Sequence, residues 1–190
     1  MKTRCSWCGD DPLYIKYHDE DWGVPVRDEQ TLFEFLLLEG AQAGLSWITV
    51  LRKREGYRAL FDDFNAEKIA RFSDAKLDKL LEDPRIIRNR LKVYGARKNA
   101  RAFLEVQDQL GSFADYIWGF VDGRPVQNTR KSMKDVPATT PLSDALSKDM
   151  KKRGFTFVGS TIMYAHMQAT GMVNDHTVDC FRREECQKLA

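Results

Sequence analysis

The sequence of 190 residues predicts an all-α protein. Apolar residues recur at helical spacing in many segments, and Ser, Asp, Gly and Pro residues stand where helices would begin or end. No stretch of useful length alternates apolar and polar residues as a half-buried strand does. The composition, 43% hydrophobic and 31% charged, is that of a globular protein. We expect a single domain over residues 1–190, with two helical lobes around a cleft.

An irregular segment rich in aromatic residues, 1–25, precedes the first strong helix signal. Asp28 can cap a helix that is apolar on nearly every side and ends at Glu39 and Gly40, so this helix belongs in the core. Ser73 can cap a later helix that Pro84 stops. The helices expected in this half of the chain span 28–40, 46–56, 57–63, 66–72 and 73–83.

In the second half, a long helix is expected, with Gly95 as a point where it could break. Residues 121–141 are the best loop candidate because they hold three prolines among polar residues. Ser143 can cap a helix that ends at Gly154, where a C′ glycine belongs. The helices expected in this half span 86–110, 112–118, 143–153 and 159–170, with a short final helix capped by Asn174.

The net charge of +2 reflects 30 basic and 28 acidic residues, so overall charge does not indicate a nucleic-acid partner. The basic residues nevertheless cluster within 52–58, 85–101 and 148–153. A basic face on a near-neutral protein fits a groove for phosphates, and helix faces crossed by ion pairs would give the same pattern.

No apolar run reaches the roughly 18 residues of a membrane span. The first residues, Met-Lys-Thr-Arg, lack a signal-peptide core. We therefore expect a cytoplasmic protein with no membrane partner, whose four cysteines are thiols rather than disulfides.

Two cysteines and two histidines suggest a metal site between the chain ends. His176 and Cys180 are four residues apart, which on a helix places both on one face. Together with Cys5 and His18 they form a closed tetrahedral set for zinc. Four protein ligands leave no position for a catalytic water, so the zinc would be structural.

Such a zinc would staple residues 1–25 to residues 172–190, because chain termini fray unless they are tied down. The spacing also allows Cys8 or Cys186 as a ligand, or a set of buried thiols with scattered histidines and no metal. His166 lies in the middle of a predicted helix and is interpreted as a packing or surface residue.

The segment from Lys151 to Gly159 joins two predicted helices through a tight turn flanked by glycines. Glycines let the backbone approach a ligand, and the free N–H groups of the second helix can bind a phosphate. This is the arrangement of a helix-hairpin-helix that grips DNA without reading its sequence, although an ordinary αα-hairpin would look similar. The residues expected to contact DNA here are Lys152, Arg153, Gly154, Phe157 and Gly159.

Nearly the whole chain resembles the 3-methyladenine DNA glycosylase I family, a divergent branch of the helix-hairpin-helix DNA glycosylases. The resemblance rests on RCxW at 4–7, DPLYIxYHD at 11–19, WGVP at 22–25, LEGxQAGLSWITVL at 38–51, RGFxFVG at 153–159 and MQAxGxVNDH at 167–176. It implies a helical glycosylase fold and release of 3-methyladenine from alkylated double-stranded DNA by a bacterial, cytoplasmic enzyme, which we expect to act as a monomer.

The resemblance also implies roles for individual residues. Tyr17 and Trp47 would sandwich the flipped base, and Glu39 would accept hydrogen bonds from it. Gly44 and Leu45 would lie at the gap that the base leaves in the DNA. Trp22 and Trp7 would shape the pocket, and the zinc ligands would be Cys5, His18, His176 and Cys180.

Adenine methylated at N3 is cationic in the nucleotide and is therefore a good leaving group. Aromatic faces attract a cationic ring, and a buried carboxylate such as Glu39 needs a partner. We expect Glu39 to give recognition and some catalysis with water as the nucleophile, because no lysine is marked for Schiff-base chemistry. A salt bridge from Glu39 to Arg52 or Arg54 is the simpler interpretation, with the aromatic residues as core.

Two further classes of protein fit parts of this pattern. A zinc-stabilised nucleic-acid-binding domain would use the hairpin but not the pocket, and a zinc hydrolase would need a site with only three protein ligands. Asp175, next to His176, is expected to orient neighbouring groups and is not assigned a catalytic role.

Overall fold

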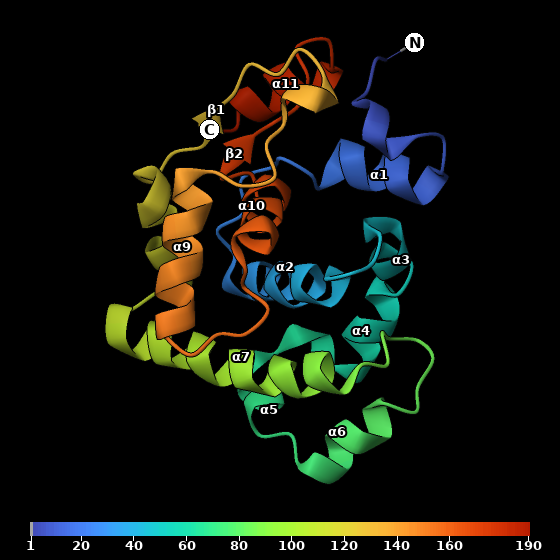
Figure 1. Cartoon of the computed structure of the whole chain (residues 1–190), viewed down its shortest axis with the longest axis vertical. Helices are drawn as coiled ribbons and strands as arrows, with labels where there is room; N and C mark the ends of the chain where they lie inside the picture. Colours follow the sequence, from blue (N-terminus) through green and yellow to red (C-terminus); the bar gives the residue numbers. More distant parts are fainter. Residues whose placement is uncertain (1) are drawn as a thin grey trace.

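The computed structural model describes residues 2–190, and the mostly helical architecture predicted from the sequence is confirmed (Figure 1). Met1, with which the predicted domain begins, lies outside the described residues. No helix within residues 2–190 combines the length and apolar character needed to cross a membrane. The α-helices are α1 (Pro12–Glu20), α2 (Glu29–Gln42), α3 (Trp47–Leu51), α4 (Arg54–Leu60), α5 (Ala66–Ala70), α6 (Asp74–Leu80), α7 (Arg90–Leu110), α8 (Phe113–Trp118), α9 (Pro141–Lys152), α10 (Ser160–Ala169) and α11 (Phe181–Gln187).

Short 3-10 helices and one pair of strands complete the fold: η1 (Ser6–Cys8), η2 (Asp62–Phe64), η3 (Gly119–Val121), η4 (Met133–Asp135), β1 (Val126–Gln127) and β2 (Val173–Asn174). The strands pair in parallel, Val126 with Val173 and Gln127 with Asn174. The sequence did not predict this pair, because two residues per strand are too few to show alternation. The loop expected at 121–141 contains β1 and η4.

Helix α2 runs through the centre of the molecule (Figure 1). Its predicted start is confirmed, because the Asp28 carboxylate accepts from the N–H of Thr31 at 2.8 Å. It continues past Gly40 to Gln42, since Gly40 packs against another segment and does not end the helix. A Cβ on Gly40 would lie 3.2 Å from the Cβ of Phe157.

Glycines at two further helix sites likewise mark close packing where the sequence suggested an end or a break. The helix expected at 46–56 is divided into α3 and α4 by a turn at Lys53, and Gly56 lies inside α4. A Cβ on Gly56 would lie 2.3 Å from the carbonyl oxygen of Arg85. Helix α7 passes unbroken through Gly95, where a Cβ would lie 3.0 Å from Cγ2 of Thr156.

Several helix starts also differ from prediction. The aromatic segment 1–25 contains α1, which Asp11 caps, and α7 begins after Asn89 rather than at residue 86. Helix α9 begins at Pro141, two residues before Ser143, because Thr140 is its N-cap, and Ser143 completes a capping box with Thr140. The side chain that looked like a cap is thus the third residue of its helix.

The two ends of the chain lie together at one end of the molecule, and α4 to α7 form the opposite end (Figure 1). The N–H of Phe181 donates to the carbonyl of Thr3 at 3.1 Å, which ties the first residues to α11. The buried apolar side chains form one contiguous cluster from Cys5 to Cys180. The predicted division into two lobes remains an interpretation.

The turn between α9 and α10 is held by a buried asparagine of α7. Asn99 is 3% exposed, its amide nitrogen donates to the carbonyl of Thr156 at 2.9 Å, and its oxygen accepts from the N–H of Thr156 at 2.8 Å. Phe157 follows with a left-handed φ of 57°, which costs free energy in a non-glycine residue. The asparagine therefore holds a turn that would not adopt this shape by itself.

Replacing Asn99 by Ala should lower the free energy of unfolding by about 2 kcal/mol or more, because two backbone groups lose their partners. Urea denaturation of the full chain would measure the change. Lys98→Ala, an exposed neighbour on the same helix, is the matched control. Equal stability of the two variants would show that the asparagine does not hold the turn.

Candidate active site and metal centre

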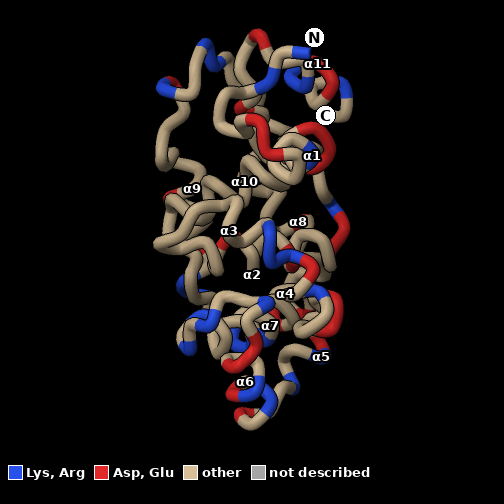
Figure 2. Tube along the Cα trace, turned by 90° about the vertical axis from the view of Figure 1, so that its right-hand side faces the viewer, with Lys and Arg blue, Asp and Glu red and all other residues tan. Residues whose placement is uncertain are grey.

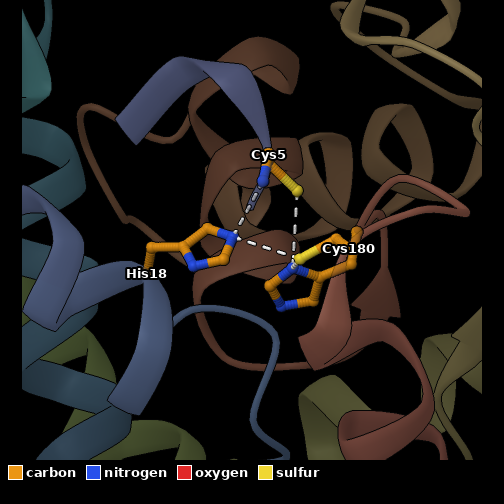
Figure 3. Close-up of side chains that lie close together, drawn as sticks. Cys5, His18 and Cys180 are labelled. Atoms are coloured by element: carbon orange, nitrogen blue, oxygen red, sulfur yellow. Dashed lines mark hydrogen bonds between the residues drawn. The ribbon is translucent and has the colours of Figure 1, made fainter. Parts of the chain in front are cut away.

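Cys5, His18, His176 and Cys180 converge in one buried cluster, and Figure 3 shows three of them with their labels. One ligand atom from each residue lies within 4.8 Å of the others. Sγ of Cys180 lies 3.4 Å from Nδ1 of His176 and 3.5 Å from Nε2 of His18. A tetrahedral zinc ion with ordinary bond lengths would set sulfur–nitrogen separations at about 3.5 Å. The donor atoms therefore fit a single ion of that size.

Each histidine of the cluster is oriented through its other ring nitrogen. Nδ1 of His18 lies 2.8 Å from Oδ1 of Asp19, which in turn accepts two-pronged hydrogen bonds from Arg4 at 2.7 to 3.0 Å. Nε2 of His176 lies 3.0 Å from the carbonyl oxygen of Trp22. Partners of this kind fix the ring and its tautomer in metal sites of proteins.

The two thiols of the cluster influence each other's ionisation. The hydrogen bond from Cys5 lowers the pKa of the Cys180 thiol, and the same bond raises the pKa of Cys5. Cys8 is buried outside the four-residue cluster, where its Sγ contacts the carbonyl of Cys5 at 3.2 Å. The geometry thus favours Cys5 over Cys8 as a ligand.

His176 and Cys180 reach the cluster from a turn and not from a helix, which corrects the expectation from their spacing. β2 ends at Asn174, and α11 begins only after Cys180. Asn174 therefore caps no helix; its side-chain oxygen accepts from the N–H of His176 at 3.3 Å. A turn can bring positions i and i+4 together as closely as a helix does.

A pocket of about 610 Å³, part of it open to solvent, lies beside the metal cluster. Aromatic rings form much of its wall. Its residues come from η1, α1, the turn after α1 that holds Trp22, α2, α3, α10 and the segment around η4. All five residues that the sequence assigned to base binding line it. The lining consists of Trp7, Tyr14, Tyr17, Trp22, Glu39, Gln42, Trp47, Met133, Val136, Ala165 and Gln168.

Glu39 is the acidic residue of this pocket. It is 4% exposed, and burial raises the pKa of its carboxyl group to about 8. Its side chain makes no hydrogen bond or ion pair with the rest of residues 2–190. Arg52 instead pairs with Asp11 at 2.6 Å, and Arg54 pairs with Glu34 at 2.7 Å, so the simpler salt-bridge interpretation is wrong. A buried acid without a partner lowers the stability of the fold, and such a group in a pocket is a candidate for binding a ligand.

Tyr17 and Trp47 contact each other in this structure. Their ring centroids are 5.3 Å apart and the planes are tilted by 49°. A base between the two rings needs about 7 Å, twice the ordinary carbon contact distance. The sandwich implied by the resemblance would therefore require one ring to move, and its role stays a prediction.

The aromatic wall is shared with the metal cluster. The ring of Trp22 lies 4.6 Å from that of His176, and the ring of Trp7 lies 5.3 Å from that of His18. Trp7 and Trp22 also contact each other at 5.1 Å. The side of the pocket formed by these tryptophans is therefore positioned by the metal-binding residues behind it.

The residues expected at the DNA gap lie on the turn after α2. Gly44 has a left-handed φ of 78°, and Leu45 is 40% exposed. Lys92 of α7 donates to the carbonyls of Ala41 and Ala43 at 2.8 and 2.6 Å, which holds the end of α2. The turn therefore presents an apolar side chain on a braced backbone.

The hairpin residues predicted to contact DNA lie around the turn between α9 and α10. Lys152 is exposed, while Arg153 pairs with Asp149 at 2.8 Å. A Cβ on Gly154 or Gly159 would meet no atom within 4 Å, so both glycines border open space. Phe157 differs from its expected role, because it packs inward against Gly40 and Gly95.

The basic clusters are interleaved with acidic residues (Figure 2). Much of the basic charge within 52–58 and 85–101 is engaged in ion pairs, as the alternative interpretation held. Such pairs are Arg54–Glu34, Arg58–Glu34, Arg85–Asp83, Arg90–Asp78 and Arg97–Asp74.

Sequence reasoning missed several residues that line the pocket. Gln42, Gln168 and Tyr14 lie within the matched motifs and could have been found there. Met133 and Val136 come from the segment around η4, which carries no motif. His166 is buried with its Nε2 3.2 Å from the carbonyl of Leu32, which agrees with a packing role.

The helical fold, the hairpin and the aromatic pocket around an unpaired acid are together typical of a protein that binds a planar base. A family model described as methyladenine glycosylase matches residues 7–183. DNA-3-methyladenine glycosylase 1 of Escherichia coli (strain K12) is 50% identical over 177 residues, 93% of this chain and 95% of that protein. DNA-3-methyladenine glycosylase of Haemophilus influenzae is 48% identical over 180 residues, 95% of this chain and 97% of that protein.

Solved structures agree. A crystal structure of 3-methyladenine DNA glycosylase I superposes with a TM-score of 0.93 at 52% identity, covering 94% of this chain and 98% of the other. The enzyme from Staphylococcus aureus gives 0.92 at 34% identity, covering 95% and 96%. The chain therefore belongs to the methyladenine glycosylase family, and the resemblance seen in the sequence is confirmed.

The cluster predicts one divalent metal ion per chain. Elemental analysis of the full chain, purified without chelator, should find it, and Cys180→Ser should lose it together with about 5 °C or more of thermal stability. Cys8→Ser is the matched control and should keep both. A metal-free wild type of unchanged stability would contradict the assignment.

The raised pKa of Glu39 predicts a pH-dependent stability. Between about 4.5 and 8 the folded chain holds the proton that the unfolded chain loses, so this group destabilises the fold as pH rises. The stability gained by Glu39→Gln over wild type should grow by about 3 kcal/mol between pH 5 and pH 8. Denaturant titrations at both pH values measure it, with exposed Glu105→Gln as control. A pH-independent difference would mean an ordinary carboxyl group.

Proposed function

We propose that this chain flips 3-methyladenine out of alkylated double-stranded DNA and hydrolyses the bond between the base and its sugar. The observation that carries the proposal is the unpaired, buried Glu39 in an aromatic pocket of base-binding size. A variant of 3-methyladenine DNA glycosylase I that is 34% identical to this chain has been solved in complex with 3-methyladenine.

The charge of the substrate explains why one carboxyl group would suffice. Adenine methylated at N3 is cationic before cleavage, and a cation beside Glu39 returns that acid to its ionised form. The faces of Tyr17 and Trp47 favour the same charge. The pocket would thus gain most from the alkylated base and least from neutral adenine.

Water is the proposed nucleophile, and the enzyme is proposed to be monofunctional. No lysine of residues 2–190 lines the pocket, so no amine is available there for a Schiff base. The leaving group is already activated by its charge, so the carboxylate needs only to hold the base and stabilise the sugar cation that forms.

DNA would be held on both sides of the pocket. Leu45 would enter the space left by the flipped base, and the free N–H groups at the start of α10 would bind a phosphate beside Gly159. Lys152 and Arg153 would add charge at the same turn. These assignments, the monomeric state and the cytoplasmic location remain predictions.

The metal ion is proposed to be zinc in a structural role, bound by Cys5, His18, His176 and Cys180. Two sulfurs and two imidazoles are the donors that zinc prefers, and they fill its tetrahedral shell. Bound there, zinc would supply cross-linking of the chain ends and no activated water. The residues themselves fix the first segment against the turn after β2.

Incubation with methylated duplex DNA tests the proposal. The metal-replete protein should release 3-methyladenine and leave 7-methylguanine, and Glu39→Gln should lower kcat/KM by about 10- to 100-fold, the worth of a hydrogen bond to a charged group. Exposed Glu105→Gln is the matched control.

Failure of folded wild type to release any base would reject the catalytic proposal and favour a DNA-binding domain without activity. Full activity of Glu39→Gln would reject only the role of Glu39.

A further inference from the structure

Gln168 of α10 lines the pocket with an amide whose orientation is fixed from behind. Its Nε2 donates to Oδ2 of Asp175 at 2.9 Å. Because a carboxylate can only accept, the nitrogen must face Asp175 and the oxygen must face the other way.

Asp175 is itself immobilised by three further donors. Its side chain is fully buried and pairs with Arg130 at 2.9 Å. Asn128 donates to the same oxygen at 2.8 Å, and the hydroxyl of Tyr164 donates to the oxygen that Gln168 contacts. The carboxylate is therefore held on two sides and can hold the glutamine in turn.

The oxygen of Gln168 remains available. It accepts no hydrogen bond from residues 2–190, yet it is not among the unpaired side-chain atoms sealed from solvent. Gln168 is only partly exposed and lines the pocket, and its nitrogen faces away toward Asp175, so we infer that the accessible oxygen faces the pocket. The pocket therefore holds two groups without a partner, Oε1 of Gln168 and the carboxyl group of Glu39, and the second becomes a pure acceptor when a cationic base ionises it.

We propose that Gln168 is a specificity-determining residue whose oxygen, aimed by Asp175, accepts a hydrogen bond from the exocyclic amino group of the flipped adenine. This inference rests on the proposed function. An amino group has two hydrogens, so it can serve both acceptors, whereas the 6-oxygen of a guanine would face them with lone pairs. Rejection of a base with oxygen at this position follows from unpaired acceptors, not from shape.

Removal of the acceptor at nearly constant volume tests the idea. Gln168→Met should lower kcat/KM for 3-methyladenine in duplex DNA about tenfold, the worth of one neutral hydrogen bond, and leave release of 3-methylguanine unchanged or raised. Gln109→Met, the same change at an exposed position of α7, is the matched control and should alter neither. An equal fall for both bases, or no fall, would overturn the inference.

A second measurement is decided by the wild-type chain, so it does not depend on whether a variant folds. Tryptophan fluorescence of the wild-type chain should report binding of free 3-methyladenine but at least about tenfold weaker binding of 3-methylhypoxanthine, which carries oxygen in place of the amino group. In Gln168→Met this preference should shrink about tenfold. Equal binding of both bases by wild type would overturn the inference, whatever the variant does.

The two proposals fail in different ways. If wild type releases neither alkylated base from DNA, the proposed function is wrong. If wild type releases 3-methyladenine and Gln168→Met keeps its selectivity, only the role of Gln168 is wrong.

Discussion

The pocket depends on the junction of the two chain ends at Cys5, His18, His176 and Cys180. Three of the four ligands are close in sequence to a residue that lines or supports the pocket: Trp7 lies two residues after Cys5, Tyr17 precedes His18, and Asp175, which holds Gln168, precedes His176. Without the junction, the segment before α2 would be a short helix on a frayed terminus, and its aromatic rings would have no fixed positions. The part of the pocket wall formed by Trp7, Tyr14, Tyr17 and Trp22 therefore depends on contacts between residues more than 150 positions apart. The Cys180–His18 contact at 3.5 Å is one of them.

Several buried polar groups that lack a hydrogen-bond partner, and therefore destabilise the fold, lie in the pocket beside this junction. Glu39 is buried without a partner, and the indole nitrogens of Trp7 and Trp47 are sealed and unpaired. Outside the pocket, several buried polar side chains are fully paired, as in the two hydrogen bonds of Asn99 and the four of Asp175. Nδ1 of His166 and the Nε atoms of Arg182 and Arg183 are further buried atoms without a partner. Local violations of this kind mark the part of a fold that selection shaped for a ligand.

The helical class and most helices follow from the sequence, because spacing and capping residues act locally: Asp28 and Ser73 start helices as predicted. The four-residue cluster could be predicted because its two residue types, cysteine and histidine, are rare in the chain. Errors arose where a residue serves a distant contact. Gly40, Gly56 and Gly95 suggested helix ends or breaks in the sequence. In the structure each lies inside a helix, where the absence of a side chain lets another segment pack closely. Met133 and Val136 reach the pocket because of the tertiary course of the segment around η4, which no local sequence pattern predicts.

The contact between Phe157 and Gly40 links the hairpin to the residue next to Glu39. The turn proposed to bind a phosphate and the acid proposed to read the base thus belong to one close-packed body, and packed interiors deform little. In a body of this kind, the protein alone would set the distance between the bound phosphate and the flipped nucleotide. Any change of shape needed for binding must then come from the DNA. The stiffness of the duplex at the damaged base would therefore contribute to the free energy of binding. Weakly stacked steps beside a damaged base would be processed before rigid ones, without any contact to their base edges.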